Sequence, residues 1–581
     1  MRKVWALLLL FLATTLIARS GMQAQGPAPA TRPKLVVLLV IDQMRTDYLE
    51  DPRVPWHGGF RRLLTEGAWF EHGEYPYMNT VTCAGHTTIG TGAYPRTHGM
   101  TLNGWWDRTR RVSVTCNDDP DSPVLPYREA RPPAPAPTTT KTPPEADPDA
   151  QPKPPAPAPA PAPKTGTSAK MMLAPTLADE LRAQRPGARV VTMSLKARSA
   201  IGLAGHGGTS VTWIDDTAAA FSTSRAYAPA LVPEMAEFLK RDPYTADVGK
   251  TWTLRDPANT YRYADATLGA RPSTSRTGLF PHRVAGTTKG PDAQFFALWQ
   301  TSPHSDAYLG RMAAAMVDAY RLGQREGIDF LGVSLSALDL VGHGFGPESR
   351  EVEDMVRRLD DTVGALFDHL DQKVGRGNWV LGFSSDHGVA PTAITSGGGR
   401  ITTEDVRERI EEALVTRYGP RKEGDKDTNY VASVTFNYVY FAQGVYDRLK
   451  ADSAALTEVE KAILSVPGMT RVLRSDRLSD TSSDRDVRSA ALSWAPGRSG
   501  DLILIGKPYW YFGPRGDASG TTHGTSNLYD RRVPVVLLGA GIKAGKYSQT
   551  ASPADLAPTV AQIIGVKLPK AEGRVLKEAL R

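Results

Sequence analysis

The sequence predicts an α/β protein built on buried parallel strands. Three continuous runs of β-branched and leucine-rich residues are typical of such strands, at 34–41, 329–334 and 379–384. Helical patterns alternate with these runs, and the longest is the amphipathic segment 351–374. The 581 residues and the hydrophobic content of 41% allow one large domain with a substantial core and insertions.

The N-terminus has the pattern of a secretory signal peptide over residues 1–25. Arg2 and Lys3 precede an apolar run that is short for a membrane-spanning helix, and small residues follow it. We therefore expect export with cleavage rather than a stable membrane anchor. The mature chain would be one catalytic domain, 26–581.

The remaining elements follow from hydrophobic periodicity and from helix start signals. In chain order we expect helix 60–66, strand 68–74, helix 84–91, helix 176–184, strand 189–195, helix 304–326, helices 404–417 and 457–465, strand 533–538, and helix 552–564, whose first turn holds Pro553.

Three segments interrupt this alternation. Residues 131–165 hold 14 of the 45 prolines, many as Pro-Ala repeats, and we expect a disordered surface insertion there. Residues 204–302 are rich in aromatic residues, glycine and proline. Residues 397–513 carry helices and polar strands. We interpret both as inserted, cap-like regions that cover the site.

Charge and cysteine content narrow the function. The net charge of +7 is diffuse, without a long lysine or arginine run, so we expect no nucleic-acid partner. Cys83 and Cys116 are the only two cysteines. Export would permit a disulfide between them, although the sequence does not establish whether they pair.

Residues typical of metal sites follow the predicted strands. Mixed carboxylate and imidazole ligands suit Zn²⁺ better than Mn²⁺ or Fe²⁺. Any one pair could be structural, but their repeated position directly after buried strands favours a shared metal site. With the Thr82 hydroxyl, seven candidate ligands result: Asp42, Thr82, Asp339, His343, Asp386, His387 and His523.

Two further features favour phosphate chemistry. Thr82 precedes a small-residue helix, whose free N–H groups and dipole suit an anion, although a threonine there is more often a helix cap. Lys196 and Arg198 follow an apolar strand and can point the same way from an extended end. They form either an exposed basic edge or a phosphate clamp.

Taken together, these motifs resemble those of the alkaline phosphatase superfamily. They are VIDQMR at Asp42, NTVTCAGHTTIGTG with YPRTHGMTLN from Thr82 to Asn103, SLKAR, LDLVGH, SDHG and THG. They are most similar to the branch that holds the PafA-type alkaline phosphatases and the nucleotide pyrophosphatase/phosphodiesterases. The resemblance implies an alkaline-phosphatase-like fold, a mixed, mainly parallel sheet sandwiched by helices.

The resemblance also implies two Zn²⁺ ions per chain. Asp339, His343 and His523 would hold one ion. The other would be held by Asp42, Asp386 and His387, with the Thr82 oxygen bound to it.

PafA-type phosphomonoesterases carry an asparagine, a lysine and an arginine on the phosphoryl oxygens, and Asn103, Lys196 and Arg198 match these. Because the phosphodiesterases as a family lack the Lys/Arg pair, the match favours phosphate monoesters. The expected mechanism is attack by Thr82, a phospho-threonine intermediate, and its hydrolysis by water.

Other readings remain open. A phosphodiesterase or nucleotide pyrophosphatase of the same superfamily is the main alternative. A sulfatase lacks support because no C-x-P-x-R pattern occurs at Cys83, and a phosphoglycerate mutase would normally use serine. An exported binding protein with a vestigial site is the alternative from another class.

We expect small phosphate monoesters as substrates and a periplasmic location. The sequence leaves the natural ester and the oligomeric state open, a monomer being one possibility. Trp105 and Trp106 could line the pocket or belong to the core.

Overall fold

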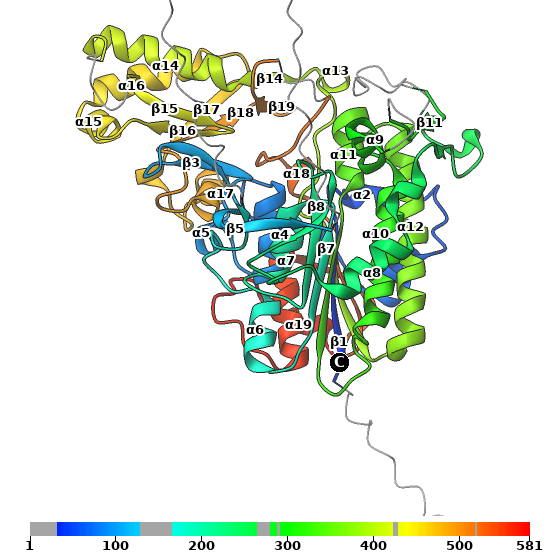
Figure 1. Cartoon of the computed structure of the whole chain (residues 1–581). Helices are drawn as coiled ribbons and strands as arrows, with labels where there is room; N and C mark the ends of the chain where they lie inside the picture. Colours follow the sequence, from blue (N-terminus) through cyan, green and yellow to red (C-terminus); the bar gives the residue numbers. More distant parts are fainter. Residues whose placement is uncertain (1–31, 128–165, 264–278, 287–290, 422–427, 517–519) are drawn as a thin grey trace, which may run out of the picture.

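The structure is a computed structural model that describes residues 32–127, 166–263, 279–286, 291–421, 428–516 and 520–581. The predicted signal peptide, 1–25, and the predicted Pro/Ala-rich insertion, 131–165, lie outside the described residues. Figure 1 shows a large sheet flanked by helices, with a smaller lobe above one side of it.

An eleven-stranded sheet forms the centre of the protein. Its strands, in order across the sheet, are β21 (Gly545–Ala551), β2 (Ala68–Gly73), β20 (Val535–Gly539), β13 (Trp379–Ser384), β1 (Leu35–Ile41), β12 (Asp329–Leu335), β7 (Val190–Ser194), β8 (Ser210–Asp215), β9 (Ala220–Ser224), β5 (Asp118–Pro126) and β6 (Gly166–Thr167). The five neighbours from β13 to β8 are mutually parallel, and antiparallel pairs lie toward the edges. The predicted mixed α/β fold is therefore confirmed.

Helices cover both faces of this sheet (Figure 1). Alternate side chains of β1 point to opposite faces, and each set joins a different core. One core contains Leu35, Val37 and Leu39; the other contains Val36 and Leu38. The first is closed by α3 (Gly59–Glu66), α8 (Pro233–Arg241), α9 (Ala293–Gln300), α10 (Pro303–Ala319) and α12 (Arg350–Leu370); the second by α4 (Thr82–Thr91), α6 (Leu177–Gln184), α7 (Ala197–Ala204) and α19 (Leu556–Ile564).

The parallel register brings several strand ends to one edge. Strands β13, β1, β12 and β7 are adjacent and run in the same direction, so their carboxyl ends open on the same side. Since β20 runs antiparallel to β13, the segment that enters β20 also lies at this edge. Ligand sites of open α/β sheets occur at such an edge.

A smaller four-stranded sheet forms the second lobe, at the top of Figure 1. Its strands are β15 (Val431–Thr435), β16 (Tyr438–Phe441), β18 (Leu502–Gly506) and β17 (Met469–Arg474), and its helices are α14 (Thr403–Tyr418), α15 (Val445–Ala451) and α16 (Ser453–Leu464). These elements share a separate core.

Further short α-helices and strand pairs connect these elements. They are the helices α2 (Thr46–Leu49), α5 (Pro95–His98), α11 (Ala337–Phe345), α13 (Ala393–Ser396), α17 (Arg485–Ser493) and α18 (Leu528–Arg531), with the paired strands β3 (Gly104–Asp107) and β4 (Val112–Thr115), β10 (Thr251–Trp252) and β11 (His282–Arg283), and β14 (Gly399–Thr402) and β19 (Trp510–Gly513).

Two predicted helices are shorter than expected. The helix predicted over 304–326 ends at Ala319, because Arg321 and Gly323 adopt left-handed backbone conformations with φ of 47° and 66°. The helix predicted over 552–564 begins at Leu556, and Pro553 lies in a preceding single turn of 3₁₀ helix.

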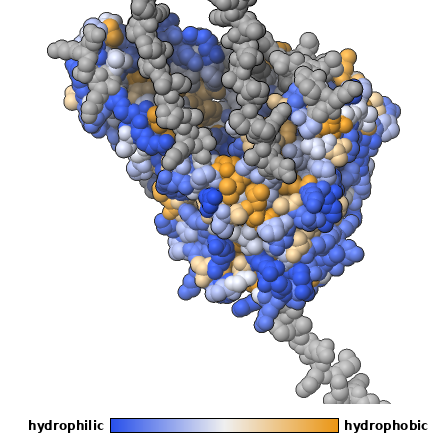
Figure 2. Space-filling view, viewed as in Figure 1, coloured by the Kyte–Doolittle hydropathy of each residue, from blue (hydrophilic) through white to orange (hydrophobic). Residues whose placement is uncertain are grey.

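The outer surface is mostly polar on the face seen in Figure 2, with hydrophobic residues gathered near its middle. Exposed large hydrophobic side chains such as Ile394 and Leu528 come from separate elements. Among the helices that the structure describes, none combines the length and the apolar character needed to span a bilayer.

The two cysteines form a disulfide, a point that the sequence left open. Cys83 lies in the first turn of α4, and Cys116 directly follows β4. Their Cα atoms are 6.6 Å apart, and 33 positions separate them in the chain. The bond therefore fastens the β3–β4 hairpin to the beginning of α4.

Reducing this disulfide should lower the free energy of unfolding. Opening a loop of 33 positions removes a constraint on the unfolded chain of about 3–4 kcal/mol in the loop-entropy treatment. We expect the midpoint of guanidinium unfolding to fall when dithiothreitol is added. The double variant Cys83→Ala/Cys116→Ala should match the reduced protein and ignore the reductant. Identical unfolding curves for oxidised and reduced wild-type protein would contradict the expectation.

Candidate active site

The predicted site residues come together at the edge of the central sheet. Asp42 follows β1, Asp386 and His387 follow β13, and Asp339 and His343 lie on α11 after β12. His523 comes from the loop that precedes α18 and β20. The side chains other than His523 therefore owe their places to adjacent strands in parallel register.

One predicted group is compact. The ligand atoms of Asp339, His343 and His523 all lie within 4.8 Å of one another. The Nε2 atoms of His343 and His523 are 3.2 Å and 3.6 Å from Asp339 Oδ1. Asp339 and His343 reach the same point because residues four apart on a helix share a face.

The predicted second group, Asp42, Asp386 and His387, meets at His387 Nε2. Asp42, Asp339 and His387 also have their ligand atoms within 4.8 Å of one another. Asp386 Oδ2 lies 3.2 Å from His387 Nε2. Lys196 Nζ lies 2.5 Å from both Asp42 Oδ2 and Asp339 Oδ2 and pairs with both carboxylates.

The three histidines have the orientation of metal ligands. Each Nδ1 lies within hydrogen-bond distance of a backbone carbonyl: His343 of Thr521 at 2.8 Å, His523 of Thr80 at 2.9 Å, and His387 of Gly388 at 3.0 Å. Because a carbonyl only accepts, each Nδ1 carries the proton, and Nε2 is the atom that faces the carboxylates. This arrangement is typical of histidines that bind metal through Nε2.

Buried atoms without partners support a cation at this position. Asp42 Oδ1, Asp386 Oδ2 and His387 Nε2 are buried and accept or donate no hydrogen bond within the described residues. His387 Nε2 is 3.4 Å from Asp42 Oδ1. An ion bound among these atoms would satisfy all three, and the mixture of carboxylate and imidazole is one that Zn²⁺ takes. The residues present therefore fit the metal that the resemblance implies.

The pKa shifts of these residues also indicate a functional site. Burial, reinforced by the carboxylates of Asp339 and Asp386, raises the pKa of Asp42 to about 7. Burial alone would lower the pKa of His387, but Asp386 and Asp42 outweigh it and raise that pKa to about 9. Burial and the adjacent His387 ring hold the pKa of His523 well below its ordinary value. Such strong mutual shifts are typical of functional sites.

Thr82 is the first residue of α4 and is almost fully buried at the bottom of the site. A helix start offers free N–H groups and a positive dipole to an anion. Asn103 lies next to it, and its Oδ1 accepts a hydrogen bond of 2.9 Å from the Cys83 N–H. The Nδ2 group of the Asn103 amide is therefore the one that can donate a hydrogen bond to a ligand. Its backbone carbonyl accepts from the Cys116 N–H, so the disulfide region holds Asn103 on both sides.

Lys196 and Arg198 do not form the parallel pair that an extended strand end would give. Lys196 is the N-cap of α7, and Arg198 lies within that helix. Their side chains therefore diverge. Lys196 is buried against the carboxylates, whereas Arg198 faces the cavity above Thr82. Within the part of the chain that the structure describes, Arg198 Nε has no hydrogen-bond partner.

Gln43 is a site residue that the sequence reasoning missed. Its backbone N–H donates to Asp386 Oδ1 at 3.1 Å, and its Nε2 donates to Asp339 Oδ1 at 2.6 Å. It therefore connects both groups of candidate ligands. Its backbone has a φ of 65°, which an ordinary side chain rarely adopts. Its position directly after Asp42 was a visible signal, but this backbone conformation was not.

His86 is a second residue of the site to which the sequence analysis assigned no role. It lies one turn after Thr82 on α4 and is fully buried. Its Nδ1 lies 3.2 Å from Asp386 Oδ2 and 3.0 Å from the Thr82 carbonyl, and its Nε2 lies 2.8 Å from Ser334 Oγ. His86 thus lies between Asp386 and the backbone of the helix that carries Thr82.

A cavity of about 650 Å³ opens above these residues. It is bordered on the sheet side by Thr82, Asn103, Arg198, Asp339, His343 and His523. The other side is formed by β15, β19 and the β3–β4 hairpin. Part of the region 397–513 therefore borders the cavity. None of its described lining residues comes from 204–302, a region that instead adds β8 and β9 to the central sheet.

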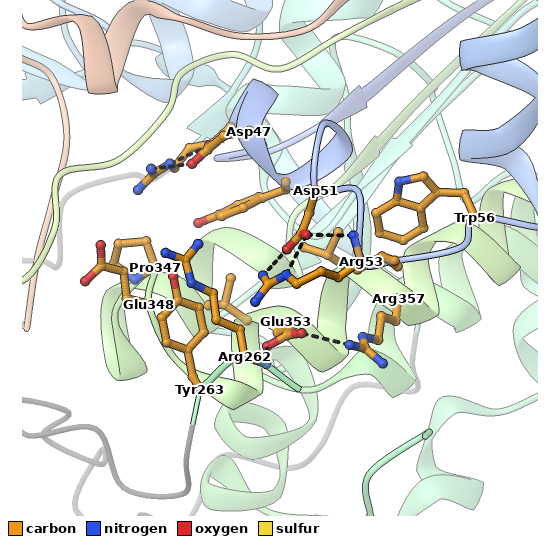
Figure 3. Close-up of a pocket in the computed structure, with 15 residues that line it drawn as sticks. Asp47, Asp51, Arg53, Trp56, Arg262, Tyr263, Pro347, Glu348, Glu353 and Arg357 are labelled. Carbon is orange, nitrogen blue, oxygen red and sulfur yellow. Dashed lines mark hydrogen bonds and ion pairs between the residues drawn. The ribbon is translucent and has the colours of Figure 1, made fainter. Parts of the chain in front are cut away.

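We assign no ligand to two other polar clusters. Figure 3 shows a hollow of about 50 Å³ in which Asp51 pairs with Arg53 and Glu353 with Arg357. Because these charges satisfy one another and the space is small, we assign it no ligand.

A second cluster consists of His57, Asp360 and Asp361, whose polar atoms contact other protein groups. Asp360 accepts three backbone N–H groups at the start of α3, and Arg255 contacts both His57 and Asp361.

Comparisons with known proteins agree with this geometry. The family model described as type I phosphodiesterase / nucleotide pyrophosphatase matches residues 36–526, a span that contains every predicted site residue. The chain is 30% identical to alkaline phosphatase PafA of Elizabethkingia meningoseptica over 98% of both chains. It is 28% identical to alkaline phosphatase PhoV of Synechococcus elongatus, over 96% of this chain and 94% of that one.

Comparison with solved structures also shows similarity to alkaline phosphatase PafA. The crystal structure of wild-type alkaline phosphatase PafA is similar with a TM-score of 0.78 at 28% identity, and the match covers 96% of this chain and 100% of that chain. Murine ectonucleotide pyrophosphatase / phosphodiesterase 5 has a TM-score of 0.53 at 14% identity, over 94% of this chain and 100% of that one, and shares the fold alone.

The position of Gln43 leads to a prediction about metal binding. Gln43→Met keeps the length of the side chain but removes the hydrogen bond to Asp339 Oδ1. We expect metal affinity to fall by about 10–100-fold, the usual effect of losing a hydrogen bond to a ligand. Titration calorimetry on the metal-free protein would measure it.

Gly342→Ala should act in the same direction, because its Cβ would lie 1.8 Å from Gln43 Oε1. The matched control is Gln443→Met, at an exposed glutamine. Unchanged affinity in Gln43→Met, with normal folding, would rule out this role for Gln43.

Proposed function

Because the chain belongs to the type I phosphodiesterase / nucleotide pyrophosphatase family of the alkaline phosphatase superfamily, we propose that it is a zinc-dependent alkaline phosphatase for phosphate monoesters. It is a hydrolase of phosphate esters. The observation that carries the proposal is the meeting of Thr82, Arg198 and the candidate metal ligands around one cavity.

A monoester fits the charges around the cavity. Its phosphoryl group is a dianion with three non-bridging oxygens. The free end of the Asn103 amide, the Arg198 guanidinium and the start of α4 all lie at the cavity, and each can donate to such an oxygen. A diester has a substituent in place of one oxygen and carries less charge for Arg198 to pair with.

Two metal positions are proposed from the donor sets. Asp339, His343 and His523 would hold one ion; Asp42, Asp386 and His387, beside Thr82, would hold the other. Zn²⁺ ions there would supply Lewis-acid stabilisation of the Thr82 oxygen and of the leaving oxygen. Lys196 neutralises part of the charge on Asp42 and Asp339.

The chain's own residues would carry out a two-step displacement. Thr82 Oγ1 forms a bond to phosphorus as the bond from phosphorus to the leaving oxygen breaks, which gives a phospho-threonine. The Thr82 proton passes to solvent, and the leaving oxygen takes a proton from water. Water then attacks the phospho-threonine, releases inorganic phosphate and restores the Thr82 hydroxyl. Asn103 and Arg198 hold the phosphoryl oxygens in both steps.

The second candidate is a phosphodiesterase. The description of the matching family favours it, and so does the position of Lys196. Because its ammonium is bound to Asp42 and Asp339, the cation facing the cavity from this pair is Arg198. The preference for monoesters therefore rests on Arg198 and Asn103.

We further propose that the protein is exported to the periplasm and acts on small phosphate esters. The basic and apolar pattern of residues 1–25 supports export, and an exported chain can keep the Cys83–Cys116 disulfide.

The first experiment compares p-nitrophenyl phosphate with bis-p-nitrophenyl phosphate at alkaline pH. We expect a higher kcat/KM for the monoester, loss of activity with a chelator, and recovery when zinc is added. A higher kcat/KM for the diester would establish the second candidate instead. Activity that survives exhaustive chelation would exclude the metal-dependent mechanism.

The matched variant for this assay is Arg198→Ala. Since Arg198 is proposed to pair with the third phosphoryl oxygen, its loss should reduce monoester hydrolysis by about 10–100-fold and diester hydrolysis much less. Equal losses on both esters would remove the charge argument for a monoester.

Thr82→Ala tests the nucleophile. We expect kcat to fall by at least about a thousandfold, because the covalent step has no substitute. Metal content, measured by mass spectrometry, should stay at the wild-type value. Acid quenching with ³²P-labelled substrate should leave label on the wild-type chain and none on Thr82→Ala. Retained turnover in the variant would refute the assignment.

A further inference from the structure

A chain of buried polar groups connects α4 with the beginning of α7. Its middle consists of three fully buried serine hydroxyls: Ser334 Oγ lies 3.4 Å from Ser336 Oγ, which lies 3.1 Å from Ser194 Oγ. At one end the backbone N–H of Lys196 donates to Ser194 Oγ at 3.1 Å. At the other end Ser334 Oγ lies 2.8 Å from His86 Nε2. The chain therefore runs without interruption from the N-cap of α7 to a histidine of α4.

The hydrogen bonds of this chain determine the tautomer of His86. His86 Nδ1 lies 3.0 Å from the Thr82 carbonyl, which can only accept, so Nδ1 carries a proton. The chain has four links, and a neutral ring leaves four protons to fill them, from the three hydroxyls and the Lys196 N–H. If Nε2 were protonated as well, one hydroxyl proton would have no acceptor among these groups. The arrangement therefore favours a neutral ring that accepts from Ser334 at Nε2 and donates from Nδ1.

The Nδ1–H group faces a carboxylate of the candidate active site. Besides the Thr82 carbonyl, His86 Nδ1 lies 3.2 Å from Asp386 Oδ2. The same oxygen is buried and lies 3.2 Å from His387 Nε2. The other oxygen of this carboxylate, Asp386 Oδ1, accepts from the Gln43 N–H at 3.1 Å. The carboxylate is therefore bounded by Gln43 on one side and by His86 on the other, and Oδ2 is the oxygen directed toward the proposed metal position.

Close packing of α4 keeps the imidazole in this orientation. A Cβ built on Gly85 would lie 2.3 Å from the backbone oxygen of Asp386, and one built on Gly202 of α7 would lie 2.8 Å from His86 Cβ. Because both positions are glycine, α4 approaches the Asp386 segment and α7 at distances that a larger residue would prevent. The His86 side chain is fully buried between them, so its ring has little freedom to turn.

We propose that His86 is a positioning residue for Asp386. Held by Ser334 as the neutral tautomer with its proton on Nδ1, it fixes the orientation of the carboxylate without adding a positive charge that would compete with a metal ion. The serine chain also links this carboxylate to the first turn of α7, which carries Arg198. This inference rests on the proposed function, since Asp386 matters here as a proposed metal ligand beside Thr82.

The test compares His86→Leu with His86→Asn in the zinc-loaded full chain. Both replacements branch at Cγ and have the same number of heavy atoms, but only asparagine can place an N–H where Nδ1 lies. Competition with a chelator of known affinity measures how tightly each zinc ion is held. For His86→Leu we expect one of the two ions to be held about 10–100-fold more weakly, the usual cost of losing a group that orients a metal ligand. For His86→Asn we expect affinities close to those of the wild type.

A spectroscopic measurement tests the tautomer directly. In the chain labelled with ¹⁵N at its histidine rings, the His86 signals are those that are missing from His86→Asn. We expect a proton on Nδ1 and none on Nε2 in the wild type, and a shifted Nε2 signal together with weaker zinc binding in Ser334→Ala. Ser224→Ala is the matched control, because Ser224 is equally buried but donates to the Thr167 carbonyl at 2.6 Å, outside this chain of groups. It should change neither the signals nor the zinc affinities.

The outcomes separate this inference from the proposed function. A proton on His86 Nε2, or equal zinc affinities in folded His86→Leu and His86→Asn, would overturn the role of His86 while the phosphatase stands. If thermal unfolding shows that His86→Leu does not fold, equal zinc affinities in Ser334→Ala and Ser224→Ala would overturn it instead. Absence of hydrolysis of both nitrophenyl esters by the zinc-loaded wild type would overturn the proposed function, whereas the tautomer and the zinc affinities would still decide the role of His86.

Discussion

Three carboxylates buried side by side at one edge of the central sheet are the constraint on which the site depends. Asp42, Asp339 and Asp386 are shielded from water, and carboxylates in such a place need positive charge nearby. Lys196 bridges two of them, and the Nε2 atoms of three histidines face the group. Burial raises the pKa of Asp42, and the carboxylates of Asp339 and Asp386 raise it further. A cation among these oxygens would remove this cost, so the chemistry and the stability of this edge are linked.

The three carboxylates are kept close together by the strands, by the hydrogen bonds of Gln43 and by the packing of Gln43 against Gly342. Adjacent parallel strands β13, β1 and β12 fix where Asp386, Asp42 and Asp339 begin. Gln43 then joins the ends of β13 and β12 by hydrogen bonds, in a backbone conformation that few side chains adopt. A Cβ at Gly342 would lie 1.8 Å from Gln43 Oε1, so a side chain there would displace the Gln43 amide. The spacing of the carboxylates therefore depends on residues that bind no substrate themselves.

The cavity is divided between two parts of the protein. The central sheet supplies Thr82, Arg198 and the candidate metal ligands, whereas the second lobe supplies Phe436 across from them. The lobe has its own hydrophobic core, and Phe436 packs against both that core and the one beneath Thr82. The Cys83–Cys116 bond fixes the third wall, the β3–β4 hairpin, relative to α4.

The sequence by itself determined the α/β class, most of the elements and the set of candidate site residues, because apolar strands that end in aspartate and histidine form local patterns. Tertiary structure alone decided how these residues combine. It placed Asp339 beside Asp42, separated Lys196 from Arg198 at the start of α7, and paired the cysteines. It also revealed Gln43, whose left-handed backbone no pattern discloses, and the contacts of His86 with Asp386 and Ser334. The physical reason is that distances between chain segments hundreds of residues apart depend on strand register and on the pairing of buried charges, and neither is a local property.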